Sequence, residues 1–504
     1  MSDARLHVLL DEPPIGTVSP LVHGHFVEHL GRCVQDGLWV GHDSTIPNEG
    51  GFRTDVLNAL AKIGVPQLRW PGGCFADTYH WRDGIGPREN RPRTLGESCG
   101  LRVIEDNHLG THEFIALCRR VGAEPYLAGN VGSGSPQEMM DWVQYCNGTL
   151  DTTLVRERAA NGHLEPLNVV YWGVGNENWG CGGHYDAADY AKEFRRYATF
   201  LRRAHPGLQL IACGDNAANP DWNRELVGVL RNHLWLIDHL AIHRYWGAGH
   251  ATEFTIEEYY HLLRGPHQVE QDIRQAHALL SGVAMGRRKI GICYDEWAVW
   301  HPQARADNNY EAPSTMRDAL AAAATLDVFH AHADCVTMAN LAQIANILQC
   351  LVQTDGAAMW TTPTYHVFDL YAPHRSGASV PVRLAPDVPV HTSPAVQKSF
   401  PEASFPAGTV ALVSASATRQ NETVTVSVSN RHHAEPLTVH VTLRGASVTE
   451  TTARLLSADA PKAVNGKEAP NAVTVVPFSA TQIGDGFIVT LPPCSVATVQ
   501  VQVS

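Results

Sequence analysis

The sequence of 504 residues lacks the long apolar segments of membrane and exported proteins. No apolar run approaches the roughly 20 residues that a membrane-spanning helix needs. Near the N-terminus, Leu6 and Val8–Leu10 are too few for the core of a signal peptide. We therefore expect a cytoplasmic protein with no membrane partner.

Cysteine and histidine are present without the spacing of a metal site. None of the 11 cysteines forms a Cys-x-x-Cys pair, and none of the 27 histidines belongs to a His-Glu-x-x-His motif. Cys74, Cys213 and Cys293 lie in or beside apolar runs, where a free cysteine in a reducing compartment behaves as a small hydrophobic residue. The residues predict no metal.

Positive charge is also scarce. The chain has 38 Lys and Arg against 51 Asp and Glu, which gives a formal net charge of −13. This balance disfavours nucleic acid or an anionic membrane as a partner, because both carry negative charge. It suits any soluble enzyme that acts on a neutral ligand.

Short apolar runs alternate with helical patterns between residues 21 and 372. The eight runs expected to form strands are Leu21–Val27, Pro66–Trp70, Pro125–Gly129, Leu167–Val174, Leu208–Cys213, Leu240–His243, Lys289–Tyr294 and Cys335–Asn340. The expected helices are Thr54–Ile63, Thr111–Val121, Ala187–Ala204, Trp222–Leu236, Ile256–Ser281 and Ser314–His332. Alternation of this kind indicates an α/β fold with a parallel sheet, and eight repeats favour a (β/α)8 TIM barrel over an open sheet.

The pattern changes at about residue 373. A proline-rich connection from Pro373 to Pro406 precedes strands with a period of two, which are Thr423–Val428, Leu437–Leu443, Phe487–Val489 and Ser495–Val503. This alternation predicts a β-sandwich over residues 373–504. The strand-like stretch Leu6–Leu10 lies in residues 1–20, which we expect to join the sandwich.

Two glutamates follow two of the expected barrel strands, each close to a tryptophan. Glu177 comes after Leu167–Val174, and Glu296 comes after Lys289–Tyr294. Because the C-terminal ends of barrel strands meet at one face, the two carboxyl groups can converge across the barrel mouth. A retaining glycoside hydrolase needs such a pair about 5–5.5 Å apart, one to protonate the leaving oxygen and one to attack the sugar carbon. The sequence therefore predicts a glycoside hydrolase.

Other polar and aromatic residues gather at the same strand ends. Asn176 is placed to bind a sugar hydroxyl, and His243 and Tyr245 are placed to orient or polarise Glu296. Four tryptophans come next to these polar residues, namely Trp179, Trp246, Trp297 and Trp300. A single tryptophan more often packs between a barrel and its loops, but four together favour a carbohydrate site, because sugar C–H faces pack on indole rings.

Several alternatives fit parts of this pattern. A glutamate at a barrel mouth also suits an ion pair, a strand-end cap, an enolase or a metal site. An aldolase would need a lysine at a strand end, whereas Lys289 opens its strand at the opposite face. A carbohydrate-binding protein without activity would be expected to lose Glu177 or Glu296, and both are present. The same machinery could also act on a galactofuranoside, a xyloside or a β-glucan.

Segments along the whole barrel resemble, in order, those of glycoside hydrolase family 51, the α-L-arabinofuranosidases. They are Phe26-Val27-Glu28-His29-Leu30-Gly31-Arg32, Arg69-Trp70-Pro71-Gly72-Gly73-Cys74-Phe75, Trp81–Pro87, Asn176-Glu177-Asn178-Trp179-Gly180-Cys181-Gly182-Gly183, Asp295-Glu296-Trp297, Met338–Gln343 and Thr362–Phe368. Motifs of this length are specific for the family and less specific for the substrate.

The resemblance implies a barrel with a jelly-roll-like sandwich, a retaining mechanism, no cofactor and a hexameric, intracellular enzyme. Its substrates would be arabino-oligosaccharides or polysaccharide side chains, from which it would release terminal α-L-arabinofuranosyl residues. By position, Glu177 would be the acid/base and Glu296 the nucleophile. The residues that would line the sugar subsite are Glu28, Arg69, Cys74, Asn176, Trp179, His243 and Tyr245.

Cys74 departs from the pattern of many relatives, although a branch of the family shares it. Those relatives carry Asn after the Pro-Gly-Gly turn and use it to hold a sugar hydroxyl. A thiol is a poorer hydrogen-bond partner than an amide, so the resemblance does not settle this contact or the sugar preference. We expect the loop Trp300–Pro313 to shape the pocket beyond the cleaved bond.

Overall fold

The computed structural model describes residues 2–216, 219–399, 403–405 and 407–504. Eight parallel strands close into a barrel, and in chain order they are β3 (Gly24–Phe26), β6 (Gln67–Trp70), β9 (Glu124–Gly129), β10 (Tyr171–Val174), β11 (Gln209–Ala212), β12 (His239–Trp246), β13 (Gly291–Val299) and β14 (Val336–Leu341). Each overlaps one of the eight apolar runs, so the predicted (β/α)8 barrel is confirmed.

Helices follow most of the barrel strands. They are α1 (Thr54–Ile63), α2 (Thr111–Val121), α3 (Pro136–Asn147), α4 (Thr153–Ala160), α5 (Ala187–Ala204), α6 (Pro220–Val229), α7 (Ile256–Leu262), α8 (Gly265–Ala284), α9 (Met316–Ala331) and α10 (Pro363–Tyr371). Short 3-10 helices are η1 (Pro20–His23), η2 (Cys74–Thr78), η3 (Trp81–Gly84), η4 (Arg88–Asn90), η5 (Leu234–Leu236), η6 (Ala306–Asn308) and η7 (Ala372–His374). Among the described residues, no helix has the length and apolarity to cross a membrane.

The single helix predicted over Ile256–Ser281 is wrong, because the structure has two helices, α7 and α8, with an interruption between them. Pro266 has no N–H and cannot bind the carbonyl of Leu262 four residues earlier. That carbonyl instead accepts a hydrogen bond of 3.0 Å from the Trp246 indole N–H. Helix α6 also ends at Val229, short of the expected Leu236.

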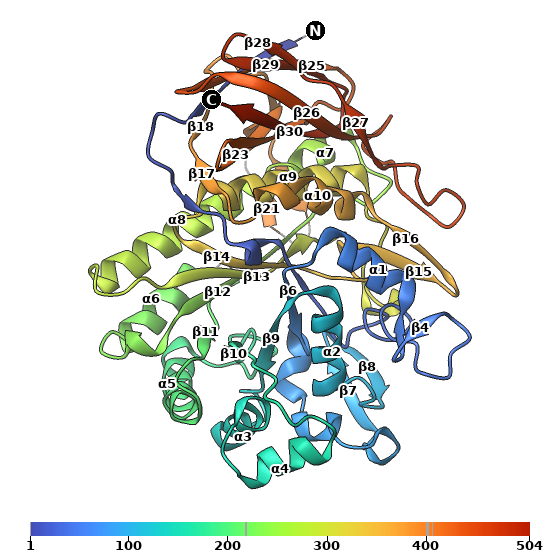
Figure 1. Cartoon of the computed structure of the whole chain (residues 1–504), viewed down its shortest axis with the longest axis vertical. Helices are drawn as coiled ribbons and strands as arrows, with labels where there is room; N and C mark the ends of the chain where they lie inside the picture. Colours follow the sequence, from blue (N-terminus) through green and yellow to red (C-terminus); the bar gives the residue numbers. More distant parts are fainter. Residues whose placement is uncertain (1, 217–218, 400–402, 406) are drawn as a thin grey trace.

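Two antiparallel sheets form the sandwich at one end of the molecule (Figure 1). One has the order β18 (Val382–Leu384), β1 (Ser2–Leu9), β25 (Leu437–Arg444), β29 (Gly486–Leu491) and β28 (Thr481–Ile483). The other has the order β2 (Gly16–Thr17), β17 (Ala378–Val380), β23 (Val413–Gln420), β24 (Thr423–Asn430), β30 (Ser495–Val503), β26 (Val448–Ser457) and β27 (Val475–Phe478). The exception to the antiparallel pattern is β1, which pairs in parallel with β25.

Five two-stranded antiparallel sheets complete the described strands. They are β4–β5 (Asn48–Glu49, Phe52–Arg53), β7–β8 (Thr94–Ser98, Leu101–Glu105), β15–β16 (Val352–Asp355, Ala358–Thr361), β19–β22 (Val390–Ser393, Gly408–Ala411) and β20–β21 (Val396–Ser399, Ala403–Phe405). The proline-rich connection therefore contains short regular strands, so its interpretation as an irregular segment is wrong. Its strands are short because proline cannot donate to a ladder, and Pro381 separates β17 from β18. Pro401 and Pro406 lie outside the described residues.

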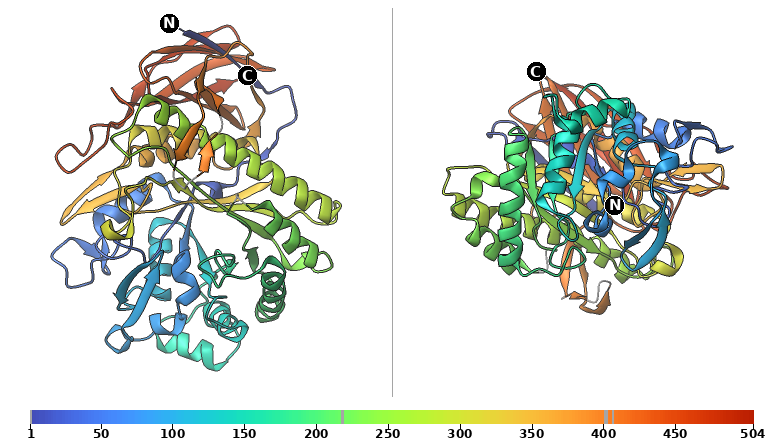
Figure 2. Two further views of the ribbon diagram at one scale, coloured as in Figure 1. Left: turned by 180° about the vertical axis from the view of Figure 1, so that it is seen from behind. Right: turned by 90° about the horizontal axis from the view of Figure 1, so that it is seen from below.

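Helices α9 and α10 lie between the barrel and the sandwich in both side views (Figures 1 and 2). Polar side chains cross this interface. The buried Asp327 of α9 accepts hydrogen bonds from Ser414, from Ser416 at 2.7 Å and from Tyr371 at 2.9 Å. Burial raises the pKa of Asp327 from 3.8 to about 6, despite these donors.

Because Asp327 binds its proton more tightly in the folded state, its contribution to stability is present below about pH 4 and is lost as the pH rises through 6. The free energy of unfolding of the native protein, minus that of Asp327→Asn, should fall between pH 4 and pH 7 by on the order of 2–3 kcal/mol. Urea unfolding at both pH values measures this. Asp459→Asn, at an exposed position, is the control, and its difference from the native protein should not change with pH. A difference for Asp327→Asn that also does not change with pH would contradict the assignment.

Candidate active site

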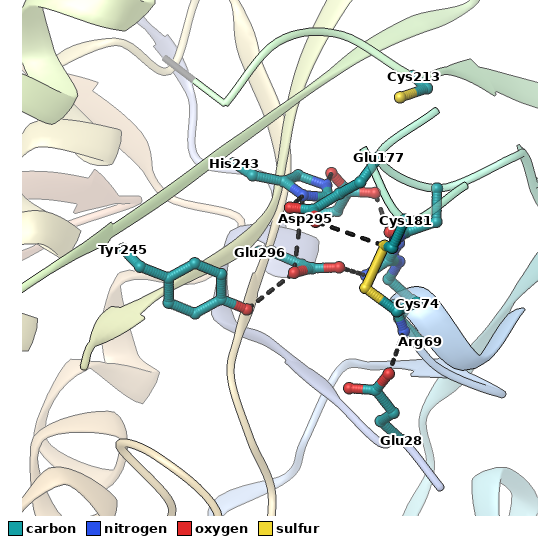
Figure 3. Close-up of polar contacts among 12 residues, drawn as sticks. Glu28, Arg69, Cys74, Glu177, Cys181, Cys213, His243, Tyr245, Asp295 and Glu296 are labelled. Atoms are coloured by element: carbon teal, nitrogen blue, oxygen red, sulfur yellow. Dashed lines mark hydrogen bonds and ion pairs between the residues drawn. A yellow bond between two sulfur atoms is a disulfide. The ribbon is translucent and has the colours of Figure 1, made fainter. Parts of the chain in front are cut away.

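The barrel strands bring the predicted site residues together at their C-terminal ends (Figure 3). Glu177 follows β10, as predicted. His243 lies in β12, as predicted, whereas β13 extends beyond the expected end and includes Glu296, so the two residues are direct neighbours across the ladder. A strand holds a side chain more rigidly than a loop does, and this register fixes Glu296 against His243.

The carboxyl groups of Glu177 and Glu296 are close neighbours. His243 Nδ1 lies 2.9 Å from Glu177 Oε1 and 3.6 Å from Glu296 Oε2. One oxygen of each carboxyl group and one His243 nitrogen all lie within 4.8 Å of one another. This separation matches a pair in which one carboxylate attacks the sugar directly, because an inverting pair stands about 6.5–9.5 Å apart to admit a water molecule.

Glu296 is held by two donors on opposite sides. Arg69 Nη1 donates to its Oε1 at 2.6 Å, and the Tyr245 hydroxyl donates to its Oε2 at 2.8 Å. The second Arg69 amino group donates to Asn176 Oδ1 at 2.5 Å. Arg69 is fully buried, so its charge acts on these partners with little screening by water.

Asp295, which the sequence analysis did not single out, completes the charged cluster. Its carboxylate lies 3.4 Å from Arg69 Nε and 3.2 Å from His243 Nε2, and it accepts a hydrogen bond of 2.7 Å from Tyr126. Burial favours its neutral form, but Arg69 and His243 outweigh burial and hold the pKa of Asp295 below its ordinary value.

The pKa values of His243 and Glu177 are both raised, for different reasons. Burial lowers the pKa of His243, but Glu296, Asp295 and Glu177 outweigh it and raise that pKa to about 10, so the ring is an imidazolium at neutral pH. Burial and, less strongly, Glu296 raise the pKa of Glu177, although its hydrogen bond to His243 opposes them. Glu177 therefore keeps a proton to a higher pH than an ordinary glutamate does.

Glu28 fastens three loops at the edge of the cluster. Its Oε1 accepts from Ser98 at 2.7 Å and from the backbone N–H of Gly73 at 3.1 Å. Its Oε2 accepts from Gln343 at 2.9 Å. Burial, followed by repulsion from Glu296, raises the pKa of Glu28.

A pocket of about 360 Å³ opens over these groups. Its wall contains Glu28, Glu177, His243, Tyr245 and Glu296, together with Cys74, Cys99, Trp179, Trp300 and Tyr310. Trp300 and Tyr310 bring the loop Trp300–Pro313 into this wall, and its expected place beyond the cleaved bond stays a prediction. The prediction that four tryptophans form a sugar surface is wrong for Trp246 and Trp297, because both indoles are buried in the hydrophobic core.

Cys74 is not the free thiol that we predicted. It forms a disulfide with Cys181, at a Cα–Cα distance of 5.5 Å and across 107 residues of sequence. The bridge joins the turn after β6 to the loop after β10, and its Cys181 sulfur lies 3.8 Å from Glu177 Oε2. Cysteine spacing alone does not determine pairing, so the sequence could not reveal this bond. Cys213 and Cys293 are free and buried, as predicted.

Glu177, His243 and Glu296 also have the side-chain types of a metal site. A histidine binds a metal only in its neutral form, whereas His243 is held as a cation. A metal at this position would have to displace that proton and the contacts of the ring nitrogens with Glu177 and Asp295. A further group of His277, Asp334 and Cys335 lies at the start of β14, away from the pocket.

The barrel, the close carboxyl pair and the pocket above it together define a retaining glycoside hydrolase. Two family models match the chain, an α-L-arabinofuranosidase 1 domain over residues 59–260 and an α-L-arabinofuranosidase C-terminal domain over residues 295–495. An intracellular exo-α-L-arabinofuranosidase of Bacteroides ovatus is 38% identical over 493 residues, which cover 95% of this chain and 92% of that protein.

Solved structures agree. The family 51 arabinofuranosidase of Xanthomonas axonopodis pv. citri has a TM-score of 0.90 and 33% identity, and each chain is covered over 100% of its length. The α-L-arabinofuranosidase of Thermotoga maritima, solved as an arabinose complex, has a TM-score of 0.88 and 31% identity over 99% of this chain and 100% of that one. The chain belongs to the α-L-arabinofuranosidases of glycoside hydrolase family 51.

Replacing the buried guanidinium should destabilise the protein strongly. Arg69→Met leaves Glu296 and Asp295 buried without their cation, and the loss of one partner of a buried ion pair costs about 3–5 kcal/mol. Urea unfolding of the variant measures the loss. Arg156→Met, at an exposed ion pair with Asp151, is the matched control and should not change stability measurably. Equal stability of both variants would refute the role given to Arg69.

Proposed function

We propose that this enzyme removes terminal α-L-arabinofuranosyl residues from arabino-oligosaccharides and polysaccharide side chains by double displacement, with Glu177 as acid/base and Glu296 as nucleophile. The proposal rests on the different environments of the Glu177 and Glu296 carboxyl groups, which have one oxygen each within 4.8 Å of the other. Arg69 and Tyr245 donate to Glu296, whereas burial keeps the proton on Glu177.

In the first step, a carboxylate oxygen of Glu296 attacks the anomeric carbon, and the bond to the leaving oxygen breaks. Glu177 gives its proton to that oxygen and becomes a carboxylate. The His243 imidazolium, 2.9 Å away, stabilises the new negative charge. In the second step, Glu177 removes a proton from water, the water oxygen attacks the same carbon, and Glu296 leaves with its electron pair. Two inversions give net retention.

Several residues are placed to hold the sugar. The Asn176 side-chain nitrogen is buried and has no hydrogen-bond partner among the described residues, so it is available to donate to a sugar hydroxyl. Glu28, Trp179 and His243 line the pocket, and Asn176 lies behind this wall, held by Arg69. Exo action is supported by the relative of Bacteroides ovatus, which is an exo-α-L-arabinofuranosidase.

The position of Cys74 departs from the direct contact that we expected. As half of a disulfide it has no thiol proton to donate, and it presents a sulfur surface to the pocket. We propose that it contacts the sugar through van der Waals packing. Family resemblance further supports a hexamer, and the intracellular relative in Bacteroides ovatus supports a cytoplasmic enzyme.

A panel of p-nitrophenyl glycosides tests the substrate. The α-L-arabinofuranoside should give the highest initial rate, above the β-D-galactofuranoside, the β-D-xyloside and the β-D-glucoside. Glu296→Ala should lower kcat at least about 10⁴-fold, because no nucleophile remains, while exposed Glu450→Ala should match the native enzyme.

Azide separates the roles of the two glutamates. It should restore part of the activity of Glu296→Ala and give a glycosyl azide of inverted configuration. With Glu177→Ala, azide should give a product of retained configuration, because the covalent intermediate still forms. Substantial activity of Glu296→Ala without azide would disprove the assignment, and a higher rate on another sugar would leave the mechanism standing and overturn the substrate.

The raised pKa of Glu177 predicts a pH dependence. As the pH rises through that pKa, the general acid is lost and kcat/KM should fall on the alkaline side. In Glu177→Ala, p-nitrophenolate departs without protonation, so this alkaline fall should disappear. Profiles of kcat/KM against pH for the two proteins make the comparison, and an unchanged alkaline limb in the variant would exclude Glu177 as its source.

A further inference from the structure

A third cysteine stands beside the disulfide in the pocket wall. Cys99 Sγ lies 3.9 Å from Cys74 Sγ, and both residues line the pocket. Cys99 is a free thiol, whereas Cys74 is bonded to Cys181. Three sulfur atoms from three separate loops therefore form one contiguous cluster next to Glu177.

The backbone holds Cys99 at the tip of the β7–β8 hairpin. Cys99 and Gly100 form its two-residue turn, with φ values of 52° and 81°. Asn, Asp or Gly normally occupies the first position of such a turn, because other residues favour negative φ. Tyr310 donates to the Cys99 carbonyl, and Ser98 donates to Glu28 at 2.7 Å. These contacts keep the thiol against the disulfide.

We propose that the three cysteines form a thiol–disulfide exchange site in which Cys74 pairs alternately with Cys181 and with Cys99. The Cys99 thiol loses its proton to water, and its sulfur attacks Cys74 Sγ. The Cys74–Cys181 bond breaks, its electron pair leaves on Cys181, and Cys181 takes a proton from water. One disulfide and one thiol are present before and after, so no oxidant is consumed.

Exchange changes what holds the acid/base loop. In the observed form the disulfide ties Cys181, four residues after Glu177, to the turn that follows β6. After exchange this tie is lost, the hairpin tip is bound to Cys74, and a free thiol stands beside Glu177. This consequence for turnover rests on the proposed role of Glu177, whereas the exchange itself does not.

The exposure of Cys181 and the pKa of the Cys99 thiol determine which small molecules can react with the cluster and how the exchange depends on pH. Cys181 is exposed, so small thiols and small disulfides can reach it from solvent. Burial and the nearby Glu28 raise the pKa of the Cys99 thiol well above its ordinary value. Because the thiolate is the attacking species, exchange should be slow at neutral pH and faster in alkaline solution.

Disulfide mapping tests the proposal without measuring activity. Native protein is held at pH 9, quenched with acid, alkylated and digested, and the linked peptides are identified by mass spectrometry. We expect a Cys74–Cys99 peptide besides the Cys74–Cys181 peptide. It should be absent from Cys99→Ser and present in Cys335→Ser, the control with a cysteine replaced at the far end of the barrel.

A second variant, Cys181→Ser, tests the Cys74–Cys99 pairing by itself, because the competing Cys74–Cys181 disulfide cannot form. Cys181→Ser has two adjacent thiols, which oxidised glutathione should convert into a Cys74–Cys99 disulfide with release of two reduced glutathione molecules. Because this variant lacks the tie to Cys181 in either redox state, its kcat should lie at least several-fold below that of the native disulfide form. If Cys74 and Cys99 accumulate only as separate glutathione adducts or free thiols, and no Cys74–Cys99 peptide forms in native protein, the proposal is overturned.

A linked peptide with unchanged kcat would overturn only the coupling to Glu177. Absence of arabinofuranosidase activity from the native protein, with the linked peptide still formed, would count against the proposed function and not against the exchange. The two proposals therefore fail in different measurements.

Discussion

The buried guanidinium of Arg69 is the interaction on which the active site depends. Four carboxyl groups converge beneath the pocket, belonging to Glu28, Glu177, Asp295 and Glu296. Their mutual repulsion in a poorly hydrated space would drive all of them toward the neutral form. Arg69 contacts two of them directly, and it has no neutral state at any pH that the enzyme meets.

Arg69 contacts only some of these carboxyl groups, and this difference in contact gives them different protonation states. Asp295 and Glu296 receive the guanidinium, whereas Glu28 and Glu177 do not touch it. His243 bridges Glu177 to the other two and is itself kept cationic by them. The permanent charge of Arg69 and the proton held by His243 thus allow Glu177 and Glu296 to differ in protonation, although the two side chains are chemically the same.

The buried carboxylate of Asp77 holds the loops around this cluster in place. Asp77 accepts from the backbone N–H groups of Val131 and Gly132 at 2.8 Å and of Asn176 at 3.0 Å. It thereby joins the loops that follow β6, β9 and β10. The Cys74–Cys181 bond joins the first and last of these loops covalently. Glu177 is consequently positioned from both sides of its own loop.

The sequence predicted the barrel and the paired glutamates because both depend on local patterns. Apolar runs mark buried strands, and a carboxylate at a strand end needs no knowledge of distant contacts. Asp295, Asp77 and the partner of Cys74 were missed because their importance comes only from residues remote in sequence. Trp246 and Trp297 were misjudged for the converse reason. Adjacency to polar residues gives no information on which face of a strand a side chain occupies.

The parallel pairing of β1 with β25 has a consequence for synthesis of the chain. Residues Ser2–Leu9 find their partners at Leu437–Arg444, beyond the whole barrel. At typical translation rates the first strand waits on the order of half a minute for its neighbour to leave the ribosome. During that interval Leu6 and Val8, fully buried in the finished sandwich, have no native site. Barrel formation can precede sandwich closure, so the nascent chain must tolerate an apolar leading segment until its last quarter emerges.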